Sequence, residues 1–557
     1  METVRHWVKE YPAGVPEKID QNRYQSVTQM FDEACRKYEN LPSFSNMGQV
    51  LTYRELDQQA EAFAAFLQSL PGMDPGERIA IMLPNLIQYP IAIFGALRAG
   101  LVVVNVNPLY TERELEHQLK DSGARAILVL ENFASKVAAV LPATELKHVF
   151  VTEVGDMFDR HKRVLTNFAV KRVKKMVPDW KIRNAVQFLS ALSLGRKMQR
   201  TTIRASADDI AFLQYTGGTT GVSKGVILSH ANIVANVLQC GSWIGATLRE
   251  REEIVLTPLP LYHVFSLVAN CLTFLRIGGH NILISNPKDL AAFVKTMRSV
   301  PWTVMTGVNT LFNALTVTPG FGPDCARSAK MSIGGGAAML RPVMESWTAL
   351  TNAPLVEGYG LSESTAGVCI NPPHQARLGS VGVPLPSTEV QIRDDEGNLC
   401  APGQEGEIEV RGPQIMRGYW GRPADTAEVL SADGWLKTGD IGTMGPDGWV
   451  AITDRKKDMI IVSGFNVYPA EIEAVVSTHP GVMEAAVIGV ADEQSGEAVK
   501  LFVVRKDPHL TEADLVEHCH RYLTRYKAPR HVEFLSELPK TPVGKVLRRA
   551  LRDVTAG

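Results

Sequence analysis

The chain has 557 residues, of which 45% are hydrophobic, and 58 Lys and Arg nearly balance 59 Asp and Glu. This is more residues than a single hydrophobic core usually contains, so the length predicts two or more domains. Because the net charge is −1, the protein has no overall positive electrostatic field that could attract nucleic acid. The seven cysteines lack C-x-x-C spacing, and "METVRHWVKEYPAGVPEK" carries charges throughout. Reduced thiols and no export signal predict a cytoplasmic protein.

The first 130 residues alternate between apolar strands and helical patterns. "RIAIMLP" from Arg78 precedes the helical pattern "IQYPIAIFGALRAG", and the apolar runs "LVVVNVN" from Leu101 and "ARAILVL" from Ala124 follow. Such alternation predicts βα units and therefore layered parallel sheets.

Residues 159–200 form a basic segment with twelve Lys or Arg against two Asp. Apolar residues recur there at roughly helical spacing with basic residues between them: Phe168, Val170, Val173, Met176 and Val177, with Lys171, Arg172, Lys174 and Lys175. Such a helix is suited to anionic lipid headgroups, which would place the protein peripherally on the inner face of the cell membrane. A solvated basic face packed on the protein body is an equally good interpretation.

The stretch "YTGGTTGVSKG" from Tyr215 to Gly225 follows a short apolar strand, "IAFLQ" from Ile210. Exposed backbone N–H groups of such a loop form an anion nest, while hydroxyls and Lys224 add hydrogen bonds and charge. The nucleotide-binding pattern G-x-x-x-x-G-K-[ST] does not fit, because Lys224 follows Ser223. A flexible linker is the weaker alternative, since linkers seldom separate an apolar strand from an amphipathic run.

The pattern of apolar and turn-forming residues changes twice in the second half of the chain. The uncharged run from Leu256 to Leu275 contains two prolines and His263, so we expect a buried loop and helix and not a membrane span. After about residue 380, short strands with turn signals predict a β-rich subdomain, and a compact α+β unit follows Arg455. The charged cluster "DRKKD" between two apolar strands is typical of a hinge, which predicts domains over residues 1–454 and 455–557.

Several polar groups in the second half suit nucleotide chemistry. "EGYGLSES" brings Tyr359, Ser362 and Glu363 together, and an acidic residue beside hydroxyls is a plausible Mg²⁺ ligand near phosphates. Asp440 in "TGD" and Arg455 in "DR" offer a carboxylate and a guanidinium for the hydroxyls of a ribose. Each signal is weak alone, but their order along the chain is specific.

In that order the motifs resemble the adenylate-forming superfamily of acyl-CoA synthetases, luciferases and peptide-synthetase adenylation domains. They are "YTGGTTGVSKG", "PLYHVF", "GYGLSES", "KTGD", "DRKKD", "SGFNVYPAEIE" and "LPKTPVGKVLRR". Outside them, "NVNPLYTERELEHQL" and "GVNTLFNAL" resemble bacterial long-chain fatty-acyl-CoA synthetases. The resemblance covers nearly the whole chain. It implies an α/β fold with a large N-terminal domain of layered parallel sheets plus a β-rich subdomain, and a small, mobile α+β C-terminal domain.

The resemblance also implies a role for each matching residue. The ATP and AMP site would consist of Tyr215, Thr216, Gly217, Gly218, Thr219, Thr220, Gly221, Lys224, Gly336, Ala337, Glu357, Gly358, Tyr359, Gly360, Ser362, Asp440 and Arg455. Lys545, Glu363 and His263 would be catalytic, and Glu363 and Thr216 would bind Mg²⁺. Ser463 and Gly464 would bind CoA, and Lys457 would be the hinge. The acyl pocket would be lined by His263, Val308, Gly334 and Gly335. Where the family often has threonine this chain has Ser362, which keeps the hydroxyl.

The uncharged walls "VLTPLPLYHVFSLVANCLTFL", "VNTLFNAL" and "GGGAAML" favour a fatty acid over an amino acid, whose ammonium needs a partner carboxylate. The expected reaction joins fatty acid and ATP into acyl-AMP, from which CoA takes the acyl group for β-oxidation or lipid synthesis. Three alternatives stay open. They are a fatty acyl-AMP ligase that serves a carrier protein, a medium-chain or aryl acid–CoA ligase, and a non-catalytic fatty-acid-binding protein. A homodimer is also left open.

Overall fold

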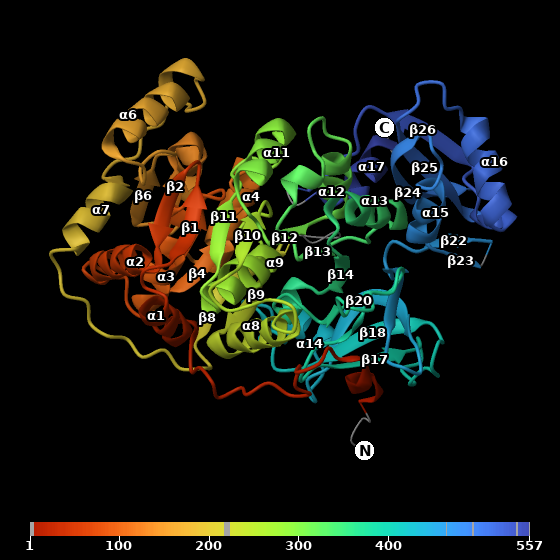
Figure 1. Ribbon diagram of the computed structural model, residues 1–557, viewed down its shortest axis with the longest axis horizontal. Coiled ribbons are helices and arrows are strands. Elements are labelled where there is room, and N and C mark those ends of the chain that lie inside the picture. Colours follow the sequence, from red (N-terminus) through yellow and green to blue (C-terminus); the bar gives the residue numbers. More distant parts are fainter. Residues whose placement is uncertain (1–4, 217–222, 464, 493–494, 542–543, 556–557) are drawn as a thin grey trace.

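The computed structural model describes residues 5–216, 223–463, 465–492, 495–541 and 544–555 (Figure 1). Among them, two large sheets, one small sheet and a separate C-terminal sheet confirm the predicted α/β class. The helices are α1 Val27–Lys37, α2 Tyr53–Gln68, α3 Gln88–Arg98, α4 Glu112–Ser122, α5 Ala134–Val140, α6 Arg160–Phe168, α7 Phe188–Gly195, α8 His230–Ile244, α9 Val264–Ser266, α10 Thr273–Arg276, α11 Leu290–Ser299, α12 Asn309–Thr316, α13 Arg341–Thr351, α14 Pro423–Val429, α15 Pro469–Val476, α16 Glu512–Tyr522 and α17 Arg548–Thr555.

The first large sheet contains the strands that the early βα alternation predicts. Its order is β19 Gly418–Tyr419, β9 Lys224–Ser229, β8 Ile210–Thr216, β4 Val102–Asn105, β3 Arg78–Met82, β5 Ala126–Leu130, β6 His148–Thr152 and β7 Val186–Gln187. The central strands pair in parallel, and their side chains are almost all buried because helices cover the sheet. Strands β8 and β9, which flank the glycine-rich stretch in the sequence, pair antiparallel with Thr216 opposite Lys224.

The second large sheet carries most residues of the candidate site. Its order is β16 Val383–Pro384, β15 Cys369–Ile370, β14 Leu355–Tyr359, β13 Met331–Gly335, β12 Val304–Gly307, β10 Ile254–Thr257, β11 His280–Leu283, β1 Pro42–Asn46 and β2 Gln49–Thr52. The run after Leu256 forms the end of β10, a loop and a broken helix, as expected. No helix in the described ranges is both long enough and apolar enough to cross a bilayer.

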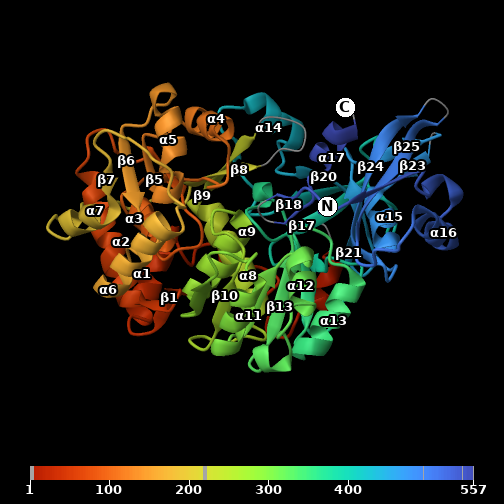
Figure 2. The same ribbon diagram turned by 90° about the horizontal axis from the view of Figure 1, so that it is seen from above.

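Two smaller sheets complete the molecule. The β-rich subdomain is a four-stranded antiparallel sheet of β17 Glu389–Arg393, β18 Gly406–Arg411, β20 Leu436–Met444 and β21 Val450–Arg455. The C-terminal sheet contains β23 Phe465–Val467, β22 Ile460–Val462, β25 Gly496–Arg505, β24 Val482–Asp492 and β26 His531–Leu535. In Figure 2 this C-terminal unit lies at the end of the molecule opposite to β5, β6 and β7. Its buried residues form hydrophobic clusters of their own.

The basic segment differs from the continuous helix that its spacing suggests. Helix α6 ends at Phe168, a wider π-helical turn, η4, covers Ala169–Val173, and Lys175 has a φ of 50°. The chain therefore leaves the helix before Met176 and Val177. In Figure 1, α6 projects from one end of the molecule.

Candidate active site

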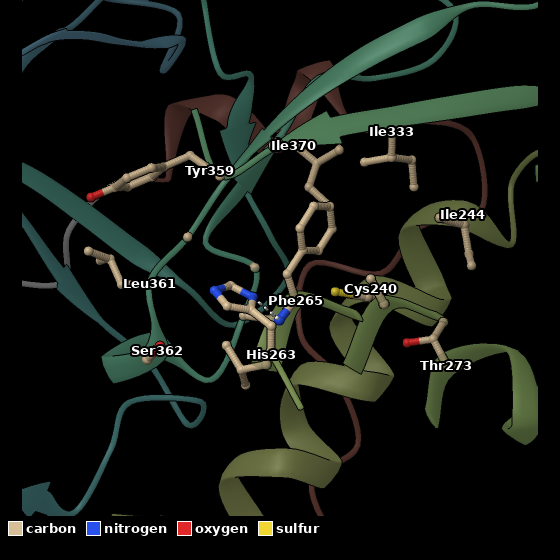
Figure 3. Close-up of a pocket in the computed structure, with 18 of the residues that line it drawn as sticks. Cys240, Ile244, His263, Phe265, Thr273, Ile333, Tyr359, Leu361, Ser362 and Ile370 are labelled. Atoms are coloured by element: carbon tan, nitrogen blue, oxygen red, sulfur yellow. Dashed lines mark hydrogen bonds between the residues drawn. The ribbon is translucent and has the colours of Figure 1, made fainter. Parts of the chain in front are cut away.

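A pocket lies where the second large sheet, helix α8 and the C-terminal unit meet (Figure 3). Its lining residues are Cys240, Ile244, His263, Val264, Phe265, Ala269, Thr273, Ile333, Gly335, Gly336, Gly358, Tyr359, Gly360, Leu361, Ser362, Ala366, Gly367, Ile370 and Lys545. Polar groups gather around Tyr359, Ser362 and Lys545, whereas the rest of the wall is mostly apolar. The described lining contains no Asp or Glu, as the uncharged walls predict.

Lys545 is the residue that the C-terminal unit contributes to this pocket. It follows Gly544, which has a φ of +83° and lies so close to Val308 that an added Cβ would stand 3.0 Å from Val308 Cγ2. A Cβ on Gly336 would likewise lie 3.3 Å from Lys545 Cε. These two glycines therefore let the Lys545 turn approach the β12 and β13 loops. Burial, and then the charge of Arg455, lower the pKa of Lys545 to about 8.

Val308 and Gly334 do not line this pocket, although sequence resemblance places both on the acyl wall. Val308 instead packs against the Lys545 turn. The space beside Gly334 is filled by Met339, whose Sδ would lie 2.5 Å from an added Cβ. Gly335 and His263 do line the pocket, so the structure brings two of the four acyl-wall residues to it.

The three residues assigned to adenine and ribose contact one another. The Tyr359 hydroxyl donates to Asp440 Oδ2 at 2.7 Å, and Arg455 Nε lies 3.1 Å from Asp440 Oδ1. Asp440 is buried, and β20 and β21 place it directly opposite Arg455 in register. This contact joins β14 of the large sheet to the last strand before the C-terminal unit.

Side-chain contacts link two of the residues that the resemblance assigns to ATP and Mg²⁺, Lys224 and Glu363. Lys224 Nζ lies 2.9 Å from Asp425 Oδ1 and 5.1 Å from the ring centroid of Tyr419. The Tyr419 hydroxyl donates to Glu363 Oε1 at 2.9 Å, so one side chain contacts both the loop lysine and the expected metal ligand. Gly217, Gly218, Thr219, Thr220 and Gly221 lie outside the described residues.

Tyr215 is held at the base of this loop by a second carboxylate. Its hydroxyl donates to Asp121 Oδ2 at 2.7 Å, and Arg422 lies 3.2 Å from Asp121 Oδ1. The Tyr215 ring packs on Gly225, where an added Cβ would meet it at 3.0 Å. The base of the glycine-rich loop is therefore fixed to helix α4 and to the segment before α14.

Glu357 is a buried acid on β14. Burial raises its pKa to about 7, and its Oε1 accepts the Met339 N–H at 3.0 Å. Gly358, Gly360 and Ser362 line the pocket directly, whereas Ala337 is exposed next to Gly336. Glu357 thus holds the loop after β13 in place behind the pocket wall.

His263 stands in the middle of the pocket (Figure 3). Its Nδ1 accepts the Phe265 N–H at 3.3 Å and so caps the short helix α9. Burial, together with the nearby Lys545 ammonium, lowers the pKa of His263 to about 3. The imidazole is therefore neutral at pH 7, with Nε2 as its N–H donor.

Of the residues assigned to the hinge and to CoA, the two that the structure describes, Lys457 and Ser463, do not line this pocket. Lys457 lines a separate small pocket with Thr438, Gly439, Arg455 and Lys456. Ser463 is exposed, has a φ of 50° and does not line the main pocket. Gly464 lies outside the described residues. The structure therefore brings Lys545, but not Ser463, to the candidate site.

The oxygen ligands assigned to Mg²⁺ fit such an ion. Thr216 ends β8, and β8 contacts the short helix η7 Ser362–Ser364, which carries Glu363. A carboxylate and a hydroxyl are hard oxygen donors that Mg²⁺ prefers, with phosphate oxygens and water completing its shell. No cluster of three or more His, Cys, Asp or Glu in the described ranges could hold a metal without such help.

Sequence reasoning did not identify several residues of the site. Tyr419, Asp425 and Asp121 act through side-chain contacts that span large sequence separations. The only local signal is "GYWGRPAD", in which an aromatic residue and charges follow a glycine. Phe265, Cys240 and Thr273 belong to apolar runs whose pattern indicates burial and not a pocket.

Comparison with known proteins agrees with this geometry. The family model described as "AMP-binding enzyme" matches residues 31–420, and "AMP-binding enzyme C-terminal domain" matches residues 471–545. A Salmonella typhimurium protein named long-chain-fatty-acid–CoA ligase is 52% identical over 99% of this chain and 98% of its own. A feruloyl-CoA synthase of Amycolatopsis is 34% identical over 91% of this chain and 94% of its own.

The fold has a similar counterpart among solved structures. The ATP-bound MatB of Rhodopseudomonas palustris superposes with a TM-score of 0.82 at 28% identity, covering 95% of this chain and 99% of that one. Three findings indicate the same family. They are the family models that match both parts of the chain, the relative that is 52% identical, and the similar fold of MatB. The chain therefore belongs to the adenylate-forming family of AMP-binding enzymes.

Proposed function

We propose that this chain is a long-chain-fatty-acid–CoA ligase that forms AMP. The observation that carries the proposal is the placement of Lys545, which enters an uncharged, largely apolar pocket beside the contact between Tyr359 and Asp440. An ammonium at that junction suits two anions that must approach each other, a fatty carboxylate and the α-phosphate of ATP. The relatives named long-chain-fatty-acid–CoA ligase support this substrate class.

The reaction divides into two displacements. A carboxylate oxygen attacks the α-phosphorus and the bond to pyrophosphate breaks, giving acyl-AMP. The thiol of CoA, losing its proton, then attacks the acyl carbon, and AMP leaves with the bridging oxygen. In the first step the Lys545 cation offsets the repulsion between the anions, while Asp440 and Arg455 orient the ribose. Neutral His263 offers an Nε2–H donor at the carboxylate end of the acyl pocket.

Mg²⁺ belongs to this proposal, with Glu363 and Thr216 as its protein ligands. The ion supplies positive charge against the triphosphate. Glu363 is held ready by the Tyr419 hydroxyl, and Lys224 lies on the other side of the same ring. Gly217 to Gly221 would bind the β- and γ-phosphates through backbone N–H groups.

The experiment is acid-dependent exchange of pyrophosphate into ATP across a panel of acids, followed by addition of CoA. Exchange with long-chain acids and release of acyl-CoA are the expected results. Exchange with feruloyl or medium-chain acids alone would favour the aryl or medium-chain alternative. Acyl-AMP that accumulates unchanged in the presence of CoA would favour transfer to a carrier protein, and binding without exchange would favour a non-catalytic binding protein.

We further propose a peripheral membrane surface on the cytoplasmic face, made of α6, η4 and the residues that follow as far as Met176. Five large apolar side chains there are exposed by half or more of their area: Val164, Leu165, Phe168, Val173 and Met176. Apolar side chains set among basic ones are the pattern of helices that lie in a lipid interface. Lys171 is engaged by Glu131 at 2.5 Å, whereas the side chains of Arg172, Lys174 and Lys175 are exposed.

Co-sedimentation with anionic vesicles tests this surface. Replacing Arg172, Lys174 and Lys175 by Gln removes three charges that each contribute about 1 kcal/mol near such a membrane, so binding should weaken strongly. Lys171→Gln is the matched control and should have a smaller effect, because Glu131 already neutralises that ammonium. Equal binding of the triple variant and the parent protein would contradict the membrane surface and leave a solvated basic face.

A further inference from the structure

One polar side chain lies at the apolar end of the acyl pocket. Figure 3 shows Tyr359, Leu361 and Ser362 on one side, His263 and Phe265 in the middle, and Ile244, Cys240 and Thr273 on the other side. Thr273 is therefore separated from the adenylating groups by the length of the pocket, in the region that the proposed function gives to the alkyl chain.

The Thr273 hydroxyl is buried without a partner. Only 1% of the residue is exposed, and its Oγ1 has no hydrogen-bond partner among the described residues. A threonine inside a helix usually donates to the carbonyl four residues back. Here the π-helical turn η5, Leu267–Leu272, precedes Thr273, and its backbone N–H donates to Asn270 and Val268, three and five residues back. The altered turn accompanies a hydroxyl that lacks this bond, on a residue that lines the pocket.

Two polar residues close to Thr273, Asn270 in the preceding turn and Cys240 in the pocket wall, do have partners. The Asn270 amide, three residues earlier, donates to Thr257 Oγ1 at 3.2 Å and accepts from Thr306 Oγ1 at 2.8 Å. Cys240 contacts Asn236 Oδ1 at 4.0 Å. Other buried side-chain atoms of the described residues also lack a partner, among them Arg276 Nε three residues later, but Thr273 alone of these residues lines the pocket.

A saturated alkyl chain cannot satisfy this hydroxyl. A buried hydroxyl against methylene groups loses its hydrogen bonds to water without replacement, which weakens binding. A chain that carries an oxygen at the same depth would restore the lost bond. Ile244, Ile333 and Ile370 line this part of the pocket and would exclude water from it.

We propose that Thr273 is a specificity-determining residue, and that the substrates of this enzyme include fatty acids with a hydroxyl or keto oxygen along the chain, which hydrogen-bonds to Thr273 Oγ1. This inference rests on the proposed function, because it requires that the pocket hold the acyl chain. It adds no step to the reaction, since the oxygen is recognised and not transformed.

The test is a positional series of monohydroxylated fatty acids of one chain length, compared with the unsubstituted acid by kcat/KM for pyrophosphate exchange. One position, or two adjacent ones, should be preferred over the other positions by roughly fivefold or more, the usual value of one hydrogen bond in a buried site. Thr273→Val keeps the shape and removes the hydroxyl, so it should abolish that preference and raise kcat/KM for the unsubstituted acid. Thr273→Ser should retain the preference.

Ile244→Val is the matched control, because it alters the size of the same wall without altering its polarity. It should change kcat/KM for hydroxylated and unsubstituted acids alike. Equal kcat/KM for all positional isomers in the parent enzyme would overturn the proposal, as would a Thr273→Val variant that keeps the positional preference. Failure of every acid, including the unsubstituted ones, to support exchange would instead overturn the proposed function.

Discussion

Two parts of the C-terminal unit differ sharply in their relation to the pocket. The turn that carries Lys545 reaches the pocket and packs against Val308 and Gly336. The hairpin of β22 and β23 carries Ser463 and Phe465, which are both exposed. Yet, by resemblance, both parts serve one reaction. A single rigid unit that places one of them in the site leaves the other outside, so we propose that the two steps use two positions of this unit.

Identifiable contacts hold the position seen here. The Tyr468 hydroxyl donates to Glu405 at 2.7 Å, and Asp454 Oδ2 accepts the Ala470 N–H at 2.8 Å, at the start of α15. Lys456 lies 2.8 Å from Asp395. These contacts flank Lys457, and all are polar. The ion pair of Lys456 with Asp395 is largely exposed and therefore weak, whereas Asp454 and Tyr468 are buried. Release of the C-terminal unit would therefore chiefly require breaking the two hydrogen bonds of Asp454 and Tyr468.

The largest expected effect comes from Lys545→Ala. Loss of the ammonium leaves the carboxylate and the α-phosphate repelling each other, so formation of acyl-AMP should fall by about 10³-fold. Conversion of supplied acyl-AMP and CoA to acyl-CoA should continue. Each half-reaction is measured separately. Lys540→Ala, which removes a lysine bound to Glu484 at 2.5 Å, is the matched control and should affect neither step strongly. Equal slowing of both steps by Lys545→Ala would indicate one static site.

Gly464→Leu should impair the second half-reaction and spare the first, the reverse of Lys545→Ala. The resemblance assigns Gly464 to a narrow pantetheine tunnel, so a large side chain should obstruct CoA without touching ATP. We expect thioester formation to fall by about 10²-fold, as for loss of one well-placed catalytic interaction, while pyrophosphate exchange stays near normal. Exchange that falls as much as thioester formation would contradict the separation of the two faces.

The comparison also shows what the sequence could predict. The motifs grouped Tyr359, Asp440 and Arg455 around one nucleotide, and the structure places these side chains in contact. Tyr359 ends β14 and Arg455 ends β21, whereas Asp440 lies within β20. The α/β class and the β-rich subdomain followed from periodicity and turn residues. Predictions of the hinge at Lys457 and of CoA at Ser463 stay predictions, since this structure contains only one position of the C-terminal unit.

Other features depend on contacts that no local pattern contains. The resemblance assigns Val308 to the acyl pocket, whereas in this structure Val308 lies beside Gly544 and does not line the pocket. Thr273 looked like part of a buried helix, and only the π-helical turn before it reveals an unpaired hydroxyl. Tyr419 was missed because its partners are distant in sequence, Glu363 by 56 residues.

A smaller effect is expected from Tyr419→Phe, which removes the hydroxyl donated to Glu363 and keeps the ring beneath Lys224. The freed carboxylate is less well oriented, so the Mg²⁺ concentration at half-maximal exchange should rise by about fivefold, as expected for one hydrogen bond. The thioester step from supplied acyl-AMP should not change. Tyr24→Phe, which removes a similar contact with Glu33 at 3.1 Å far from the site, is the control. An unchanged Mg²⁺ requirement would remove Tyr419 from a positioning role.

The smallest expected effect is a difference between the pH dependence of adenylation and that of the thioester step. The pKa of Lys545 is lowered to about 8 by burial and by Arg455, so the ammonium is complete below that pH and is lost as pH rises through it. The kcat/KM for adenylation, which reports the free enzyme, should therefore halve near pH 8 and fall about tenfold per pH unit above it. Lys545→Arg keeps its charge at these pH values and should flatten this limb of the profile, whatever its absolute rate. The thioester step, in which the other face of the C-terminal unit serves the site, should not follow the Lys545 titration. A limb that persists in Lys545→Arg would assign the titration to another group, with Glu357, whose pKa is about 7, as the first candidate.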